Sequence, residues 1–409
     1  METINFMNWK KNTVLFLASQ TVSLFGSSLV QYAITWYITL ETKSGLMMTI
    51  SIICGFLPTF FLSPFAGVWA DRYDRKLLII LSDSFIAVST LLLAVLFLMG
   101  YDAIWLLFVI SAFRSLGSAV QSPAISAFIP QFVPGDKLTK VNATNGSIQS
   151  LVMLVSPMLS GALLTIASIE AILFIDVVTA AIAISMLLFL IHVPLHKRAQ
   201  EGGKLRYFND LKEGCIYIVR HRYLKAFFLF SAVFFFMIAP AAFLTPLQVT
   251  RSFGSEVWRL TAIEVAFSVG MMVGGLIMAS WGGFGNKIHT MMLSSLMMGA
   301  GTIALGLVPE FRAYLGVMAM FGVAIPIFNT PANVLLQQKV EQDFMGRVFG
   351  VMSMISGSMM PLGMLVFGPV ADVVRIEWIL AGSGIILFLE GFLLIGNRSL
   401  VEAGKPNVA

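Results

Sequence analysis

The chain has few charged residues and few cysteines, and these shortages exclude several classes of protein. Only 11% of its 409 residues are charged, whereas a soluble protein carries about a quarter, so a water-soluble globular domain is excluded. The two cysteines, Cys54 in an apolar run and Cys215 in a charged segment, predict neither a disulfide framework nor a metal site. No metal ligands are clustered and no glycine-rich phosphate loop with lysine is present. We therefore expect no ATP hydrolysis, no enzyme activity, no metal and no cofactor.

Long apolar runs are what the chain has in abundance. It is 58% hydrophobic, with a mean hydropathy of +0.88. A membrane-spanning helix needs about 20 apolar residues, and the sequence predicts an all-α integral membrane protein with twelve transmembrane helices, the first of them retained and not cleaved as a signal peptide. The expected spans lie near 13–40, 44–68, 77–99, 103–127, 141–165, 169–192, 223–249, 258–281, 288–308, 312–335, 347–369 and 376–396.

The distribution of lysine and arginine predicts the orientation. With both termini in the cytoplasm, 20 of the 26 basic residues fall in cytoplasmic segments and helix ends, as the positive-inside rule requires. The basic excess is therefore a topology signal in a lipid bilayer, and no nucleic acid is expected as a partner. We expect a multi-pass protein of the plasma membrane.

One short segment between two apolar runs is densely charged. It reads Gly67-Val-Trp-Ala-Asp71-Arg72-Tyr-Asp74-Arg75-Lys76, which is too short to hold a folded domain and is therefore predicted to be a hairpin between two membrane helices. One interpretation is a positively charged anchor that only fixes topology.

The spacing of this segment, Gly-x-x-Ala-Asp-Arg-x-x-Arg-Lys, resembles the loop between helices 2 and 3 of the major facilitator superfamily of secondary transporters. In that family the loop is a conformational latch between two halves. Most members have glycine where this chain has Asp74, and the form found here looks most like the macrolide-efflux branch of the drug:proton antiporters. The resemblance implies a latch of Gly67, Asp71, Arg72, Arg75 and Lys76. Asp83, in the next span, is expected to partner the loop arginines or, alternatively, to titrate.

The second half of the sequence repeats the first. Gln121-Ser-Pro-Ala124 recurs as Asn329-Thr-Pro-Ala332, and paired halves are typical of secondary transporters. We predict two pseudo-symmetric six-helix halves, 1–192 and 223–409, joined by a cytoplasmic linker at 193–222. This is the major facilitator fold that the resemblance implies.

Three charges lie within spans and away from the cytoplasmic edges: Arg114, Asp176 and Glu264. An arginine at mid-bilayer costs about 3 kcal/mol, so it has either a structural ion-pair partner or a role in transport. Arg114 with Gly117 matches the superfamily's fourth-span arginine-glycine pattern, which the resemblance associates with proton coupling. A desolvated carboxylate can exchange protons near neutral pH, and Glu264 and Asp176 are the expected proton carriers.

Polar residues at helical spacing form stripes on the first, fourth, seventh and tenth spans. In the superfamily these helices line a central cavity, so the resemblance implies a substrate cavity that includes Gln20, Ser27, Gln31, Ser118, Phe234, Asn329 and Asn333. In the fifth span, Ser156-Pro157-Met-Leu-Ser160-Gly161 resembles the antiporter motif Gly-Pro-x-x-Gly-Gly, with serines in place of two glycines. Pro157 and Gly161 are the expected hinge.

These patterns together predict a monomeric, proton-coupled secondary transporter that exports small lipophilic drugs, macrolide-type antibiotics first, by alternating access. A related exporter of a natural metabolite such as a siderophore or a lysolipid is the first alternative. A non-transporting membrane receptor or scaffold is the alternative from another class, and it would not need an intramembrane arginine with two acids.

Overall fold

The computed structural model describes residues 9–134, 137–191 and 207–405, and within these ranges it contains helices and turns but no strand. Twelve of the described helices are long and apolar enough to cross a membrane, which confirms the expected all-α, twelve-span architecture. Helices are the natural solution because a bilayer offers the backbone no hydrogen-bond partners, so each span must satisfy its own peptide groups.

The chain divides into two compact units, residues 1–38 with 50–205 and residues 39–49 with 206–409. The predicted limits at 193 and 222 stay a prediction. The first unit contains most of α1 (Trp9–Thr42) and α2 (Gly45–Arg72), with α3 (Arg75–Leu98), α4 (Ile104–Phe128), the 3-10 turn η1 (Ile129–Gln131), α5 (Leu138–Ile166), α6 (Ile169–Ser185) and the π-helical turn η3 (Met186–Leu190). The second contains α7 (Tyr207–Arg220), α8 (Arg222–Phe243), α9 (Thr245–Ser252), α10 (Val257–Trp281), α11 (Lys287–Leu307), α12 (Phe311–Lys339), α13 (Gln342–Val370), α14 (Ile376–Gly396) and α15 (Arg398–Ala403).

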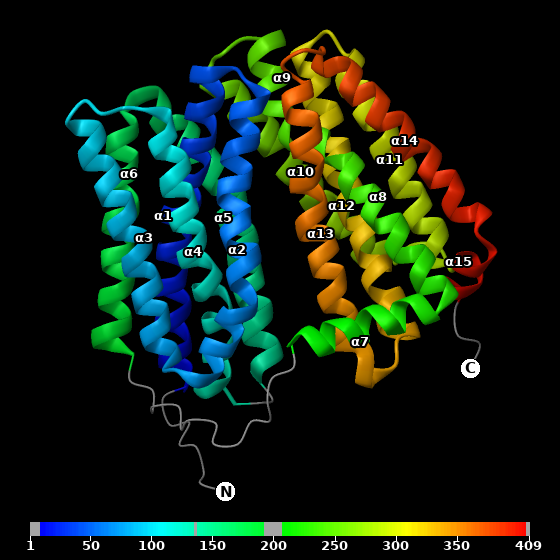
Figure 1. Cartoon of the computed structure of the whole chain (residues 1–409), viewed down its shortest axis with the longest axis horizontal. Helices are drawn as coiled ribbons and strands as arrows, with labels where there is room; N and C mark the ends of the chain where they lie inside the picture. The colour runs from blue at the N-terminus through cyan, green and yellow to red at the C-terminus, as the bar shows by residue number, and fades with distance from the viewer. Residues whose placement is uncertain (1–8, 135–136, 192–206, 406–409) are drawn as a thin grey trace, which may run out of the picture. The chain divides into compact units, whose positions relative to one another are not determined.

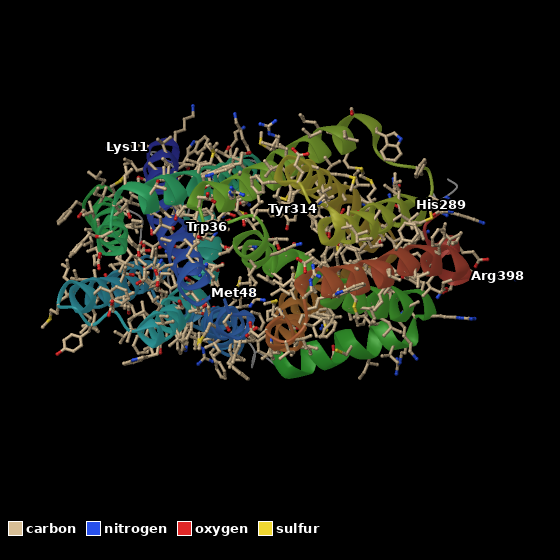
Figure 2. The ribbon with its side chains drawn as sticks, turned by 90° about the horizontal axis from the view of Figure 1, so that it is seen from above. Lys11, Trp36, Met48, His289, Tyr314 and Arg398 are labelled. Atoms are coloured by element: carbon tan, nitrogen blue, oxygen red, sulfur yellow. The ribbon has the colours of Figure 1, made fainter. Side chains whose placement is uncertain are left out.

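In the first unit, α3 packs against both α4 and α6. An aromatic cluster closes one end of the unit, where the ring of Phe16 lies 5.3 Å from that of Phe128 and 5.6 Å from that of Phe132, both edge-on. Trp36 on α1, labelled in Figure 2, is also fully buried. This packing fixes the rotation of α1, α3, α4 and α6, and so decides which side chains point into the unit.

In the second unit, close helix contacts depend on glycine. Gly270-x-x-x-Gly274 lies on α10, which packs against α12, and a Cβ added to Gly270 would lie 2.0 Å from the carbonyl oxygen of Ala319. A Cβ on Gly274 would lie 2.4 Å from that of Val323. Only glycine permits this backbone approach. Tyr314, labelled in Figure 2, is buried on the same α12.

Part of the segment predicted as a polar linker is helical. Figure 1 shows α7 lying across the ends of α8 and α13. Tyr217 stacks on Phe344 with ring centroids 4.4 Å apart, and Glu213 pairs with Arg347 at 3.2 Å. One side of the helix is therefore attached to the start of α13, so α7 is an integral part of the second unit.

The span expected at 223–249 is divided into α8 and α9. The division falls at Leu244, whose backbone N–H still bonds to the carbonyl oxygen of Pro240 at 2.8 Å. Pro246 occupies the first turn of α9, where its missing N–H leaves no unmet hydrogen bond. Pro246 also has no N–H to donate to the carbonyl oxygen four residues earlier, which explains why α8 ends before it and a new helix begins.

The short connection between α1 and α2, with the adjoining ends of both helices, belongs to the second unit. Asp372, just after α13, accepts hydrogen bonds from the backbone N–H groups of Gly45 (2.7 Å) and Leu46 (2.9 Å) and from the Ser44 hydroxyl (2.8 Å). Arg251 of α9 donates to the same carboxylate at 2.8 Å. The first turn of α2 is thus capped by an acid from α13.

Candidate functional site

The charged centre of the first unit is an ion pair between Arg114 on α4 and Asp176 on α6. Arg114 is 5% exposed and Asp176 is fully buried. Asp176 also accepts hydrogen bonds from the hydroxyls of Thr90 on α3 (3.0 Å) and Ser27 on α1 (3.1 Å). Arg114 donates further to the Thr90 hydroxyl and to the Ser27 carbonyl oxygen, the latter at 3.1 Å. The pair therefore links four helices.

This network contains the ion-pair partner that a buried Arg114 requires. A buried arginine needs a partner that compensates its charge, and Asp176 is that partner. Gly117, three residues along α4, lets the helix approach α3, since a Cβ there would lie 2.5 Å from the side chain of Ile86. The two residues of the arginine-glycine pattern on α4 therefore have separate roles. Arg114 forms the ion pair, and Gly117 allows α4 to pack closely against α3.

Asp83 on α3 lies in a different environment from Asp176. Its Oδ1 accepts hydrogen bonds from the Ser23 hydroxyl at 2.8 Å and from the Gln121 amide at 2.5 Å. The expected pairing with the loop arginines is not found among the described residues. The reason is geometric, because Asp83 lies eight residues beyond Arg75 on α3, about 12 Å further along the helix axis.

A small polar cavity adjoins Asp83 inside the first unit. Its volume is about 120 Å³, and its lining comes from α1, α4 and α5. Of the cavity residues predicted from the sequence, Gln20, Ser27 and Ser118 line it, whereas Gln31 is exposed and does not. The other lining residues are Thr21, Ser23, Leu24, Gln121, Ile125, Asn145, Ile148 and Gln149. We call this cavity the polar pocket.

The predicted residues of the second unit do not gather in one described pocket. Phe234 is buried on α8 and stacks on Phe328 of α12, with ring centroids 4.1 Å apart. Asn329 and Asn333 are exposed on α12. Glu264 is half-buried on α10 and has no hydrogen bond or ion pair within the described part of the chain.

The charged segment between α2 and α3 has clear local roles. Asp74 caps α3 by accepting the backbone N–H of Lys76 at 2.8 Å. Arg75 donates to the carbonyl oxygens of Ala70 and Ala127, both at 2.8 Å. Lys76 donates to the carbonyl oxygen of Ile191 at 2.9 Å. Gly67 is half-buried and Arg72 exposed, and the side chain of Asp71 lies outside the described residues. Arg75 and Lys76 thus bond the loop to the backbone near the ends of α4 and η3.

The expected hinge lies inside α5, which continues through Pro157 to Ile166 without a break. Pro157 and Gly161 are both buried. The side-chain hydroxyls of Ser156 and Ser160 are also buried and have no hydrogen-bond partner in the described structure. Bending at this point stays a prediction.

Two further acids of the second unit were not singled out from the sequence as site residues. Glu390 on α14 is only 4% exposed, and neither of its carboxyl oxygens has a hydrogen-bond partner among the described residues. Asp372 caps α2, as described above. Thr90 and Gln121, in the first unit, were likewise missing from the predicted site, yet each bonds a buried acid.

Comparison with known proteins agrees with the fold. The family model described as Major Facilitator Superfamily matches residues 16–364. Macrolide efflux protein A of Streptococcus pyogenes is 29% identical over 390 residues, covering 95% of this chain and 96% of that protein. The Staphyloferrin A transporter of Staphylococcus aureus is 22% identical over 404 residues, covering 97% and 99%. A bacterial homologue of the iron transporter ferroportin, solved in an inward-facing state, has a TM-score of 0.70 at 14% identity and covers 94% of this chain and 99% of that one. The chain belongs to the major facilitator superfamily and is a multi-pass membrane transporter, not an enzyme.

Proposed function

We propose that the protein is a proton-coupled exporter of small lipophilic drugs, with macrolide-type antibiotics as the first candidates. It works as a monomer by alternating access in the plasma membrane, with both termini in the cytoplasm. The single observation that carries the proposal is the likeness to Macrolide efflux protein A over nearly the full length of both chains. The buried charges supply the physical means for coupling.

Coupling requires acids that bind and release protons within the membrane. Arg114 and Asp176 form a pair linking four helices, so a change at the pair alters the packing of the first unit. Glu264 has no such cation among the described residues, and an ionisable side chain within a membrane span is costly and marks a functional position. We assign Glu264 as the proton carrier of the second unit. We assign the Arg114–Asp176 pair as the element whose rearrangement changes the packing of the first unit during transport.

The available energy is sufficient for uphill export. One proton that moves inward in exchange for an uncharged substrate releases about 2.3 kcal/mol per 100 mV of membrane potential, a contribution that cancels when the substrate leaves as a cation. A pH gradient adds about 1.4 kcal/mol per unit. Since each 1.4 kcal/mol corresponds to a ten-fold concentration ratio, about a hundred-fold substrate gradient per proton is within reach.

Substrate binding is assigned to the polar pocket together with Gln31, Phe234, Asn329 and Asn333. The polar pocket is about 120 Å³, smaller than the roughly 300–1,000 Å³ of a site that encloses a drug. It therefore accommodates one polar group of a larger substrate whose apolar body lies elsewhere.

The segment from Gly67 to Lys76, with Asp71, Arg72 and Arg75, is assigned as the conformational latch. Its bonds to the carbonyl oxygens of Ala127 and Ile191 support a role beyond topology, since an anchor would need only the charges. Pro157 and Gly161 are assigned as the hinge of α5.

The test of this function is the accumulation of labelled erythromycin in cells with and without the protein, each with and without a protonophore. Expression should lower accumulation, and the protonophore should abolish the difference. Equal accumulation in expressing and control cells would contradict macrolide export. A difference that persists after the gradient collapses would contradict proton coupling.

The likeness to the Staphyloferrin A transporter favours one second candidate, export of a natural metabolite such as a siderophore. The same cells distinguish the two, because a metabolite exporter would leave erythromycin accumulation unchanged.

A further inference from the structure

The first unit contains two buried aspartates with opposite surroundings. Asp176 faces the guanidinium of Arg114 and accepts two hydroxyl donors besides. Asp83 is 2% exposed, and its two hydrogen-bond donors, Ser23 and Gln121, are both neutral. Its Oδ2 is buried and has no hydrogen-bond partner among the residues that the structure describes. One acid therefore has its counter-charge, and the other does not.

An ionised carboxylate buried without a cation is costly by several kcal/mol. Two ligands relieve that cost, a proton on the carboxylate or a cation close to it. On α4 and α6, which pack against α3, the charged residues are Arg114, Glu170 and Asp176, and Arg114, the one cation among them, is paired with Asp176. The charged residues of α1, which bonds Asp83 through Ser23, lie near its ends: Lys10, Lys11 and Glu41. The described residues of the first unit thus leave the charge of Asp83 to be balanced from outside the protein.

The polar pocket provides the place for such a cation. Ser23 and Gln121, which hold Asp83 Oδ1, both line it. Its lining contains no charged side chain, only hydroxyls, amides and three aliphatic groups. The Gln20 side chain, which lines the pocket and is 7% exposed, has a buried Nε2 with no partner in the described structure. The pocket thus offers oxygen acceptors and lies one hydrogen bond away from an uncompensated acid.

We propose that the polar pocket binds the positively charged nitrogen group of a lipophilic substrate, and that Asp83 is its counter-charge. The pocket is large enough for such a group, and its amide and hydroxyl oxygens accept from an ammonium or face a quaternary cation. A proton on Asp83 removes the negative charge, so proton and substrate cation compete for one carboxylate. This deepens the proposed function, since that competition is what exchange of a proton for a cationic drug requires.

Binding in detergent tests this inference without any gradient. The probe is decyltrimethylammonium, whose small quaternary nitrogen group suits the pocket and carries no exchangeable proton, measured by equilibrium dialysis against the purified full-length protein at pH values from mildly acidic to mildly alkaline, with protein-free detergent micelles as the background. Wild-type affinity should rise as pH rises, because Asp83 loses its proton, by about ten-fold for each 1.4 kcal/mol of charge interaction. Asp83→Asn should bind at least about ten-fold more weakly at alkaline pH and lose the pH dependence.

Two further variants serve as controls for the binding measurement on Asp83→Asn. Asp102→Asn removes an exposed acid of the first unit and should bind like wild type. Asp83→Glu retains the charge and should retain the pH dependence, which covers the case in which Asp83→Asn fails to fold. Absence of wild-type binding, or pH-dependent binding that persists in a monodisperse Asp83→Asn protein, would overturn the assignment. Because dialysis needs no transport, its result is independent of whether erythromycin export fails in cells.

Discussion

Replacing Asp372 tests how strongly the first turn of α2 is held by the acid after α13. Asp372→Ala removes acceptors from the N–H groups of Gly45 and Leu46, from the Ser44 hydroxyl and from Arg251. Loss of a helix N-cap costs about 0.5–2 kcal/mol, and loss of a negative charge at a helix N-terminus about 0.3–1. The half-exposed ion pair adds only about 0.2–1 kcal/mol. Together we expect about 1–4 kcal/mol of destabilisation.

The measurement is thermal unfolding in detergent, followed with a thiol-reactive fluorogenic dye. The chain provides its own reporter in the half-buried Cys54, once the exposed Cys215 is replaced by serine. A loss of this size should lower the midpoint by a few degrees. Asp372→Asn keeps one acceptor oxygen and should lose less, and Asp102→Asn should melt like the parent. A midpoint of Asp372→Ala equal to that of the parent would refute the cap.

The pH dependence of this effect has a defined sign. Burial alone would raise the pKa of Asp372, but hydrogen bonds from Leu46, Gly45, Ser44 and Arg251 outweigh it and hold the pKa below its ordinary value of 3.8. A group with a depressed folded-state pKa stabilises above its unfolded value and loses that contribution as pH falls through the folded one. The difference between wild type and Asp372→Asn should therefore be constant near neutral pH and shrink only below 3.8.

Three further predictions concern the spans. Arg114→Ala should abolish erythromycin efflux and lower the melting midpoint. The exchanged pair Arg114→Asp with Asp176→Arg should recover part of the stability, and full efflux by a normally inserted Arg114→Ala protein would contradict a coupling role. Glu264→Gln should stop uphill export in vesicles yet allow downhill exchange, and uphill accumulation by this variant would exclude Glu264 as the carrier. Gly274→Leu should reduce the folded yield on size-exclusion chromatography, since its Cβ would lie 2.4 Å from the carbonyl oxygen of Val323, whereas Gly275→Leu, with open space beside it, should not.

The sequence was sufficient to predict the membrane class, the twelve spans and the family, because these depend on composition, run length and one charged motif. It also identified Arg114 and Asp176 separately as costly residues. It could not pair them, since they are far apart in the chain and their contact depends on how α4 and α6 rotate against α3. One available signal was missed. Asp83 and Thr90 are seven residues apart and share a face of α3, which marks both as inward-pointing.

Other site residues depend on packing that no local pattern reports. Phe234 belongs to a polar-looking stripe, yet it is buried against Phe328 because α8 and α12 meet there. Asp83 was expected to partner the loop arginines or to titrate, and the register of α3 against α1 and α4 puts it beside Ser23 and Gln121. Which side chains hydrogen-bond to a buried acid depends on tertiary packing, and a single sequence carries little information about that packing.

Proton-driven movement of the drug is the central claim, and everted membrane vesicles test it most directly. With an acidic interior imposed by a pH gradient, vesicles containing the protein should accumulate labelled erythromycin, and a protonophore should release it. A ten-fold gradient requires only about 1.4 kcal/mol, which one pH unit supplies for a single proton. Vesicles without the protein, under the same imposed gradient, measure the passive trapping of a weakly basic drug in the acidic interior. Uptake by vesicles shown to contain the inserted protein that is no greater than this background would contradict the account.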